Sequence, residues 1–292
     1  MKELLRKLRK YEIRIRKIIN SQRQGDFRSI FKGTGLEFDG VRPYQYGDDV
    51  RSIDWNVTAK GHGTFVKTFI EEKEQTVFLI LDVSGSQEIG SPGNQKLDIG
   101  REICGVLALS SIKELSQVGL LCFSDQKEIY VRPSKGSRQA YQIISKLYNL
   151  KRLSAKTDLD KAIRFTLNTI KRKSVIIFIS DFIDEGYEKN LKALAKKHDL
   201  VLIHITDKRE SKLPKLGIIP VYDKENNQTI WVNSSSPVFR SQLAKTYSDN
   251  SQMLQNLSNR TETTYLQIQT DEDFVTKLIR LFKVRNKMQK IG

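Results

Sequence analysis

One run of residues, from Thr76 to Ser86, most constrains how this chain can fold. It reads TVFLILDVSGS, so apolar and β-favouring residues lead directly into Asp82, Ser84 and Gly85. An unbroken apolar run rich in Val, Ile, Leu and Phe is typical of a strand that is buried on both faces. Open α/β sheets bind their ligands outside the carboxyl ends of such strands. The run therefore predicts a central strand with a candidate site directly after it.

The polar residues after this strand can turn several oxygen atoms toward one point. Asp82, Ser84 and Ser86 stand on alternate residues, and Gly85 separates the two serines. Carboxylate and hydroxyl oxygens suit Mg²⁺, which takes few protein ligands. The same residue types are ordinary turn formers, so a solvated loop is the alternative interpretation.

Two later stretches offer further oxygen ligands. Asp181 follows the apolar run SVIIFIS at 174–180, and Thr157 stands in a loop just ahead of a predicted helix. Neighbouring strands of a sheet lie about 4.8 Å apart, so loops at one sheet edge can converge on one ion. Asp82, Ser84, Ser86, Thr157 and Asp181 are therefore the candidate ligands.

From residue 76 onward, strand patterns alternate with helix patterns. This alternation predicts an α/β fold, with a mostly parallel sheet and helices on both faces. The expected strands are 76–82, 118–123, 174–181, 199–206 and 263–269, and the expected helices are 95–116, 137–149, 158–171 and 186–197. Residues 127–131 predict an edge strand, 217–222 and 229–233 a hairpin, and 237–259 and 271–288 two more helices.

The chain before residue 76 has a different composition and a different pattern of apolar residues. Residues 1–24 predict a basic amphipathic helix, which either packs on the domain or lies on acidic lipid or a partner. Residues 25–75 are rich in Gly and in short alternating apolar pieces, and predict a small β subdomain. Within it, we expect the Arg and Asp side chains to pair, and Trp55 and the tyrosines to fill a small core. Residues 76–292 then form the main domain, with a hairpin insertion near 211–236.

Charge suggests an acidic partner of some kind. The 292 residues carry a net charge of +16, and nine Lys or Arg fall within residues 1–24. Nucleic acid, an anionic membrane and an acidic protein are all candidate partners. No apolar run approaches the length of a membrane helix, and the start lacks a secretory signal. Cys104 and Cys122 form no zinc or disulfide pattern, so we expect a cytoplasmic location, with the inner face of the membrane as an alternative.

Catalysis finds little support in the sequence. His62, His198 and His204 are scattered, and no nucleophile elbow or phosphate-binding loop is present. His204 lies within an apolar strand, which favours a core histidine over a general base. We therefore expect a protein that is not an enzyme.

The five candidate ligands carry a family resemblance. Asp-x-Ser-Gly-Ser after the first sheet strand, a later Thr-x-Leu and a strand ending in Ser-Asp resemble the metal-ion-dependent adhesion site of von Willebrand factor A domains. The resemblance implies that these five residues, some through water, hold Mg²⁺ or another divalent cation such as Mn²⁺ or Ca²⁺. It also implies that a carboxylate of a protein partner completes the coordination of the ion.

The stretch in front carries a second resemblance. It is similar to bacterial proteins of the domain-of-unknown-function 58 family, in which an R-x-Y-x-x-G-D-x-x-R-x-I-D-W signature precedes a von Willebrand A-like domain. The matching positions here are Arg42, Tyr44, Gly47, Asp48, Arg51, Ile53, Asp54 and Trp55. Gln87 departs from the family, whose members often carry Met there. The resemblance implies a MoxR-type AAA+ ATPase, or a client of that ATPase, as partner.

These observations give one leading hypothesis and one alternative. The leading hypothesis is a non-enzymatic, metal-dependent protein-interaction module that binds an acidic residue of its partner. The alternative is a protein that binds nucleic acid or acidic membrane through its Lys- and Arg-rich ends. Binding of that second kind would weaken with salt and would not respond to EDTA.

Overall fold

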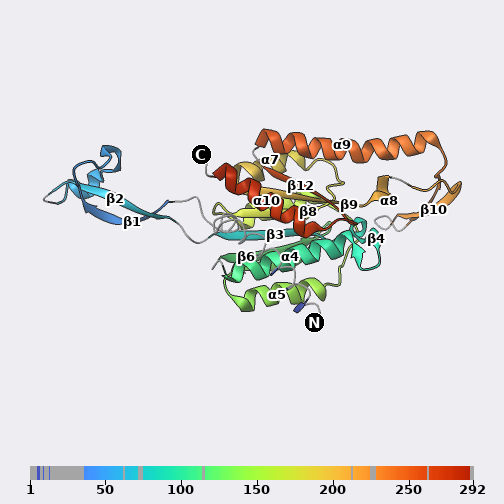
Figure 1. Ribbon diagram of the computed structural model, residues 1–292, viewed down its shortest axis with the longest axis horizontal. Helices are drawn as coiled ribbons and strands as arrows, with labels where there is room; N and C mark the ends of the chain where they lie inside the picture. The colour runs from blue at the N-terminus through green and yellow to red at the C-terminus, as the bar shows by residue number, and fades with distance from the viewer. Residues whose placement is uncertain are drawn as a thin grey trace.

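A six-stranded sheet organises the main domain of the computed structural model (Figure 1). The structure describes residues 5, 6, 9, 13, 36–61, 63–71, 75–113, 116–211, 213–223, 228–261 and 263–289. The strand order is β12-β9-β8-β3-β6-β7, and all neighbours are parallel except the antiparallel pair β6 and β7. The strands are β3 (Thr76–Asp82), β6 (Gln117–Phe123), β7 (Lys127–Ser134), β8 (Val175–Ser180), β9 (Asp199–Thr206) and β12 (Thr264–Gln269).

Helices cover both faces of this sheet. One face packs against α4 (Lys96–Lys113), α5 (Ser137–Tyr148) and α10 (Phe274–Gln289). The other packs against α6 (Leu159–Thr169), α7 (Glu188–Lys197) and α9 (Pro237–Thr261). The expected α/β class, with a mostly parallel sheet covered on both sides, is therefore confirmed.

The central strand β3 explains the unbroken apolar run in the sequence. Alternate side chains of a strand point to opposite faces. Leu79 and Leu81 join the core under α4, whereas Phe78 and Ile80 join the core under α6 and α7. Because β6 and β8 flank β3 on its two sides, the strand is enclosed, and its carboxyl end lies between those of its two neighbours at one edge of the sheet.

Several short elements surround the carboxyl ends of the strands. The turn after β3 is a 3-10 helix, η2 (Gly85–Glu88), which leads through the small hairpin of β4 (Gly90–Ser91) and β5 (Asn94–Gln95) into α4. After β9 come the short helix α8 (Lys208–Ser211) and the hairpin of β10 (Ile218–Asp223) and β11 (Gln228–Asn233). Figure 1 draws β4, α8 and β10 at the same end of the molecule.

A separate hairpin precedes the sheet, within the stretch 25–75 for which a small β subdomain is predicted. It consists of β1 (Leu36–Pro43) and β2 (Phe65–Glu71), with η1 (Val50–Ser52) and the short helix α3 (Trp55–Thr58) between them. Ile53 and Val66 are buried, but Trp55 is 66% exposed and Tyr46 is fully exposed. The expectation that Trp55 and the tyrosines fill a small core is wrong, because a two-stranded hairpin is too thin to enclose several rings.

The predicted helix at 1–24 is described at four positions. Leu5, Arg6, Arg9 and Ile13 are helical, and Leu5 packs against the core beneath α4 and α5. Arg9 donates a hydrogen bond to the hydroxyl of Tyr141 at 2.6 Å. The remainder of the predicted helix lies outside the described residues, as do the side chains of α10 after position 281. Across the helices that the structure describes, none has the length and apolar character needed to span a bilayer.

Candidate metal centre

The residues that follow β3 fold into a tight polar turn. Asp82 is completely buried, and one of its carboxylate oxygens, Oδ1, accepts the backbone N–H of Ser84 at 2.9 Å. The hydroxyls of Ser84 and Ser86 lie 3.1 Å apart. Because a short Asx-type turn forces this loop back on itself, one carboxylate and two hydroxyls face the same space.

Asp181 reaches the same space from β8. It is also buried, and it accepts a hydrogen bond from the Ser86 side chain. Its backbone carbonyl accepts the side-chain amide of Asn250 from α9 at 3.0 Å. Four of the five predicted ligands, Asp82, Ser84, Ser86 and Asp181, are therefore linked through short polar contacts at one sheet edge.

The loop that carries the fifth residue, Thr157, lies against the first loop. The backbone N–H of Gly85 donates to the carbonyl of Ala155 at 2.7 Å. Glu128 of β7 orders the start of this loop by accepting the backbone N–H groups of Leu153 at 2.8 Å and Ser154 at 3.1 Å. Thr157 is thus held near the turn, at partial exposure, directly before α6.

The backbone after Asp181 is strained. Phe182 has a φ of 54°, the one positive value among the described residues other than glycine. A bulky side chain in this region costs about 1–3 kcal/mol and needs support from its surroundings. The ring of Phe182 is completely buried, and its N–H donates to the Ser180 hydroxyl at 2.9 Å. Burial of the ring and this hydrogen bond therefore hold the backbone beside Asp181 in its strained conformation.

Electrostatics distinguishes the two buried carboxylates. Burial, and then the charge of Asp181, raise the pKa of Asp82 to about 7, while hydrogen bonds from Ser180 and Ser84 oppose the rise. Burial also acts to raise the pKa of Asp181, but the charge and hydrogen bond of Lys96 outweigh it, so that pKa is lowered. Lys96 thus compensates Asp181, whereas burial and the charge of Asp181 disfavour the charged form of Asp82, which a divalent cation would favour.

Four residues at this edge were not among the predicted ligands. Ser180 donates its hydroxyl to Asp82 at 2.7 Å, and Gln87 donates its side-chain amide to the same carboxylate oxygen at 3.2 Å. Lys96 contacts both Asp181 and Glu210. Ser180 and Gln87 are neighbours of predicted ligands in the sequence, but nothing in the sequence pattern pairs Lys96 with an acid of α8.

The donor set suits a hard divalent cation. The predicted ligands all offer oxygen atoms, which matches the preference of Mg²⁺, Mn²⁺ or Ca²⁺. Only two of them are carboxylates. In agreement with this, no group of three or more His, Cys, Asp or Glu side chains in the described part of the chain could hold a metal ion.

The signature residues lie elsewhere, on β1, η1, α3 and the loops between them. Arg42 forms a two-pronged ion pair with Asp48, each nitrogen 2.7 Å from an oxygen. Gly47 between them has a φ of 103°, a conformation that favours glycine. Asp54 begins α3 by accepting the backbone N–H groups of Asn56 and Val57. The expected pairing of Arg and Asp is thus confirmed for Arg42, and neither Arg51 nor Trp55 lies among the contacts of the oxygen cluster.

The three histidines give no catalytic arrangement among the described residues. His204 is buried in β9, and its Nδ1 lies 2.8 Å from the Tyr265 hydroxyl. Burial lowers the pKa of His204 to about 4, so it is neutral in the fold. This supports the expectation of a core histidine. His198 is buried at the end of α7, and His62 lies outside the described residues.

Comparison with solved structures finds similar chains of low sequence identity. A BatB protein from Bacteroides thetaiotaomicron aligns over 73% of this chain and 99% of its own, with a TM-score of 0.44 and 14% identity. The von Willebrand A domain of SpRpn10 aligns over 75% of this chain and 96% of its own, with a TM-score of 0.37 and 11% identity.

Comparison by sequence is more informative. An uncharacterized protein of Mycobacterium bovis, Mb1516, is 24% identical over 283 residues, which cover 96% of this chain and 89% of the relative. Rv1480 of Mycobacterium tuberculosis matches to the same extent. A family model described as "Protein of unknown function DUF58" matches residues 40–253, which include the signature hairpin and most of the main sheet. The chain therefore belongs to the DUF58 family.

Proposed function

We propose that this protein is a non-enzymatic interaction module that binds a carboxylate of a protein partner through a divalent cation. The observation that carries the proposal is the cluster of Asp82, Ser84, Ser86 and Asp181 at the carboxyl ends of β3 and β8. A Mg²⁺ ion held there by two carboxylates and neutral hydroxyls retains open positions. A partner's Asp or Glu is the ligand that best fits one of them.

Each residue of the cluster has a distinct part in this proposal. Asp82 and Asp181 would supply the negative charge, and Ser84 and Ser86 would supply neutral oxygens from the first loop. Thr157 would contribute from the loop that Gly85 holds in place. When bound, the ion would supply a Lewis-acidic centre for a carboxylate, with no bond-breaking chemistry required of the protein.

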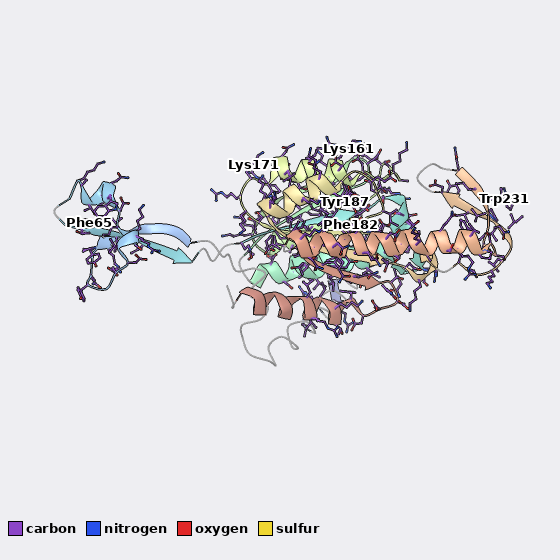
Figure 2. The ribbon with its side chains drawn as sticks, turned by 90° about the horizontal axis from the view of Figure 1, so that it is seen from above. Phe65, Lys161, Lys171, Phe182, Tyr187 and Trp231 are labelled. Atoms are coloured by element: carbon purple, nitrogen blue, oxygen red, sulfur yellow. The ribbon has the colours of Figure 1, made fainter. Side chains whose placement is uncertain are left out.

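Exposed apolar side chains on the β10–β11 hairpin and in the loop before Thr157 support a protein as the partner. Trp231 is 68% exposed and Ile218 is 69% exposed on the β10–β11 hairpin, and Leu153 is 79% exposed in the loop before Thr157. Figure 2 shows Trp231 on this hairpin, at the right-hand end of the view. Ile218 and Trp231 lie on the paired strands of this hairpin, and exposed apolar groups gathered on one element are typical of interaction surfaces. We infer from the family resemblance that the partner is a MoxR-type AAA+ ATPase or one of its clients.

The ion can be tested first, by thermal unfolding in Mg²⁺ and in EDTA. A ligand at a hundredfold excess over its Kd stabilises a protein by about 2.7 kcal/mol. We expect Mg²⁺ to raise the midpoint of the wild type and of a Glu185→Gln control, an exposed carboxylate of the same edge. Asp82→Ala should not respond. A wild type that does not respond to Mg²⁺ would remove the main support for the proposal.

The partner can be tested separately, with a purified MoxR-type ATPase. Binding should require Mg²⁺, should be lost in Asp82→Ala and should weaken in Trp231→Ser, although the Trp231 variant should keep its thermal response to Mg²⁺. Binding that ignores EDTA and falls steeply with salt would instead favour the basic ends of the chain as the contact surface.

A further inference from the structure

Lys96 is a buried lysine at the edge of the oxygen cluster. It is the first residue of α4, and its side chain is 0% exposed. Its Nζ lies 2.7 Å from the Oδ2 atom of Asp181 and also contacts the carboxylate of Glu210 on α8. The ammonium therefore bridges a predicted ligand of the ion and a second acid that the sequence pattern does not connect to it.

Further hydrogen bonds hold both acids that Lys96 contacts. Glu210 is buried, and its second oxygen accepts the backbone N–H of Asp207 at 3.0 Å. Asp181 is fixed from α9 by Asn250. Burial acts to lower the pKa of Lys96, but the charges of Asp181 and Glu210 outweigh it and raise that pKa. The lysine is thus a permanent positive charge, held without solvent around it.

A permanent charge at this place competes with a metal ion. Asp181 has one oxygen engaged by the ammonium, so part of its negative charge is already compensated. A divalent cation that used Asp181 would also be repelled by the ammonium, and such repulsion is strong where water is excluded. A site with two carboxylates and a tethered ammonium holds less negative charge than its ligand set alone suggests.

We propose that Lys96 is a tethered counter-cation that weakens divalent-ion binding at the candidate metal centre. The inference rests on the proposed function and deepens it. The protein's own charges then neutralise the ion only in part, and a carboxylate from the partner supplies the missing negative charge. The ion and the acidic partner therefore bind cooperatively. Lys96 is a positioning and affinity-setting residue, not a ligand.

The test compares Mg²⁺ binding to three proteins by isothermal titration calorimetry, with Mg²⁺ alone as the ligand. The decisive variant is Lys96→Met combined with Glu210→Gln. It removes the ammonium and the acid that the ammonium would leave unpaired, and the glutamine can still accept from Asp207. The matched control is Glu210→Gln alone, which keeps the ammonium beside Asp181. Thermal unfolding of each protein in EDTA verifies that it is folded.

The inference predicts that the double variant binds Mg²⁺ at least about tenfold more tightly than the wild type. The Glu210→Gln control should bind no more tightly than the wild type. Equal affinity of double variant and wild type would overturn the role of Lys96 and leave the proposed function standing. Tighter binding by the Glu210→Gln control would also overturn it, because the effect would then belong to Glu210.

Two further outcomes separate this inference from the proposed function. Binding by the double variant alone would support the role of Lys96 and contradict a metal-dependent function for the wild type. No binding by any of the three proteins would overturn both. A direct check of cooperativity is Mg²⁺ titration in the presence of acetate, a simple carboxylate, which should tighten Mg²⁺ binding to the wild type more than to the double variant.

Discussion

Two ion pairs of the same length lie in opposite settings in this molecule. The Nζ atom of Lys96 is 2.7 Å from a carboxylate oxygen of Asp181, and the guanidinium of Arg42 is 2.7 Å from a carboxylate oxygen of Asp48. The side chains of the first pair are 0% and 1% exposed, whereas those of the second are 42% and 20% exposed. Equal distances therefore do not imply equal energies.

The settings determine what each pair can do. Around Lys96 there is no solvent to replace a lost partner, so removal of one charge leaves an uncompensated buried charge. Around Arg42 solvent screens both charges and can take the place of either. The Lys96 pair also joins elements that lie 85 residues apart, while the Arg42 pair closes a loop of six residues. The first can couple distant parts of the fold, and the second shapes one turn.

The largest expected effect comes from Lys96→Met in the metal-free protein. Breaking a buried ion pair by removal of one partner typically costs about 3–5 kcal/mol. We expect a loss of that size in the free energy of unfolding, measured by urea titration in EDTA. Part of the loss should be recovered when Glu210→Gln is added, because the second unpaired acid is then removed.

The control for this prediction is Lys192→Met, which removes an exposed lysine from α7. It should change the free energy of unfolding by less than about 0.5 kcal/mol. If Lys96→Met lowered the free energy of unfolding as little as Lys192→Met, solvent would have to reach the Lys96–Asp181 pair. The contrast between this buried pair and the exposed Arg42–Asp48 pair would then fail.

His204 extends the comparison to another buried titratable group near Asp181. Burial lowers its pKa to about 4, with the charge of Asp181 opposing the shift. A histidine whose pKa is lower in the fold stabilises the protein above its unfolded pKa of about 6.5, and that stability is lost as the pH falls toward 4. We expect His204 itself to contribute a loss of about 3 kcal/mol over this window, seen as the difference between the wild type and a variant that lacks this histidine.

The measurement is urea unfolding at a series of pH values from 7.5 to 4 (about the range of the shift). His204→Gln removes the titrating group and should reduce the slope of stability against pH, whatever its effect at pH 7.5. An unchanged slope in the variant would mean that other groups cause the acid sensitivity.

Much of the fold could be predicted because burial repeats a simple pattern. Thr76–Asp82 is enclosed by β6 and β8 and covered on both faces, so nearly every residue must be apolar, and the sequence displays this directly. The predicted ligands could be grouped for a similar reason. Parallel strands bring their carboxyl ends to one edge, so the order of the motifs along the chain indicates their proximity.

The rest depends on pairings that no local pattern encodes. Lys96 and Glu210 are separated by 114 positions, and a lysine at the start of a helix resembles an ordinary solvent-exposed charge. Trp55 and Tyr46 look like core residues by composition, yet the thin β1–β2 hairpin leaves them exposed. The sequence therefore predicts which residues are polar or apolar much better than it predicts which polar groups meet.

The smallest expected effect on stability comes from Arg42→Gln. The hydrogen bond from Arg42, and then that from the Gln45 backbone, lower the pKa of Asp48 to about 2. A carboxyl whose pKa is lowered in the fold contributes stability above its unfolded pKa, and that contribution is lost as the pH falls toward 2. Since the pair is exposed, we expect only a slight change in the thermal midpoint at pH 7.

The clearer readout of Arg42→Gln is the titration of Asp48 itself, followed by NMR of its carboxyl carbon. We expect the pKa of Asp48 to rise from about 2 toward the ordinary value of about 3.9 when Arg42 is replaced. Arg51→Gln, at the other signature arginine, is the matched control and should leave that pKa unchanged. A titration of Asp48 near 4 in the wild type would show that solvent already separates the pair, and the contrast with Lys96 would then be larger than the equal distances suggest.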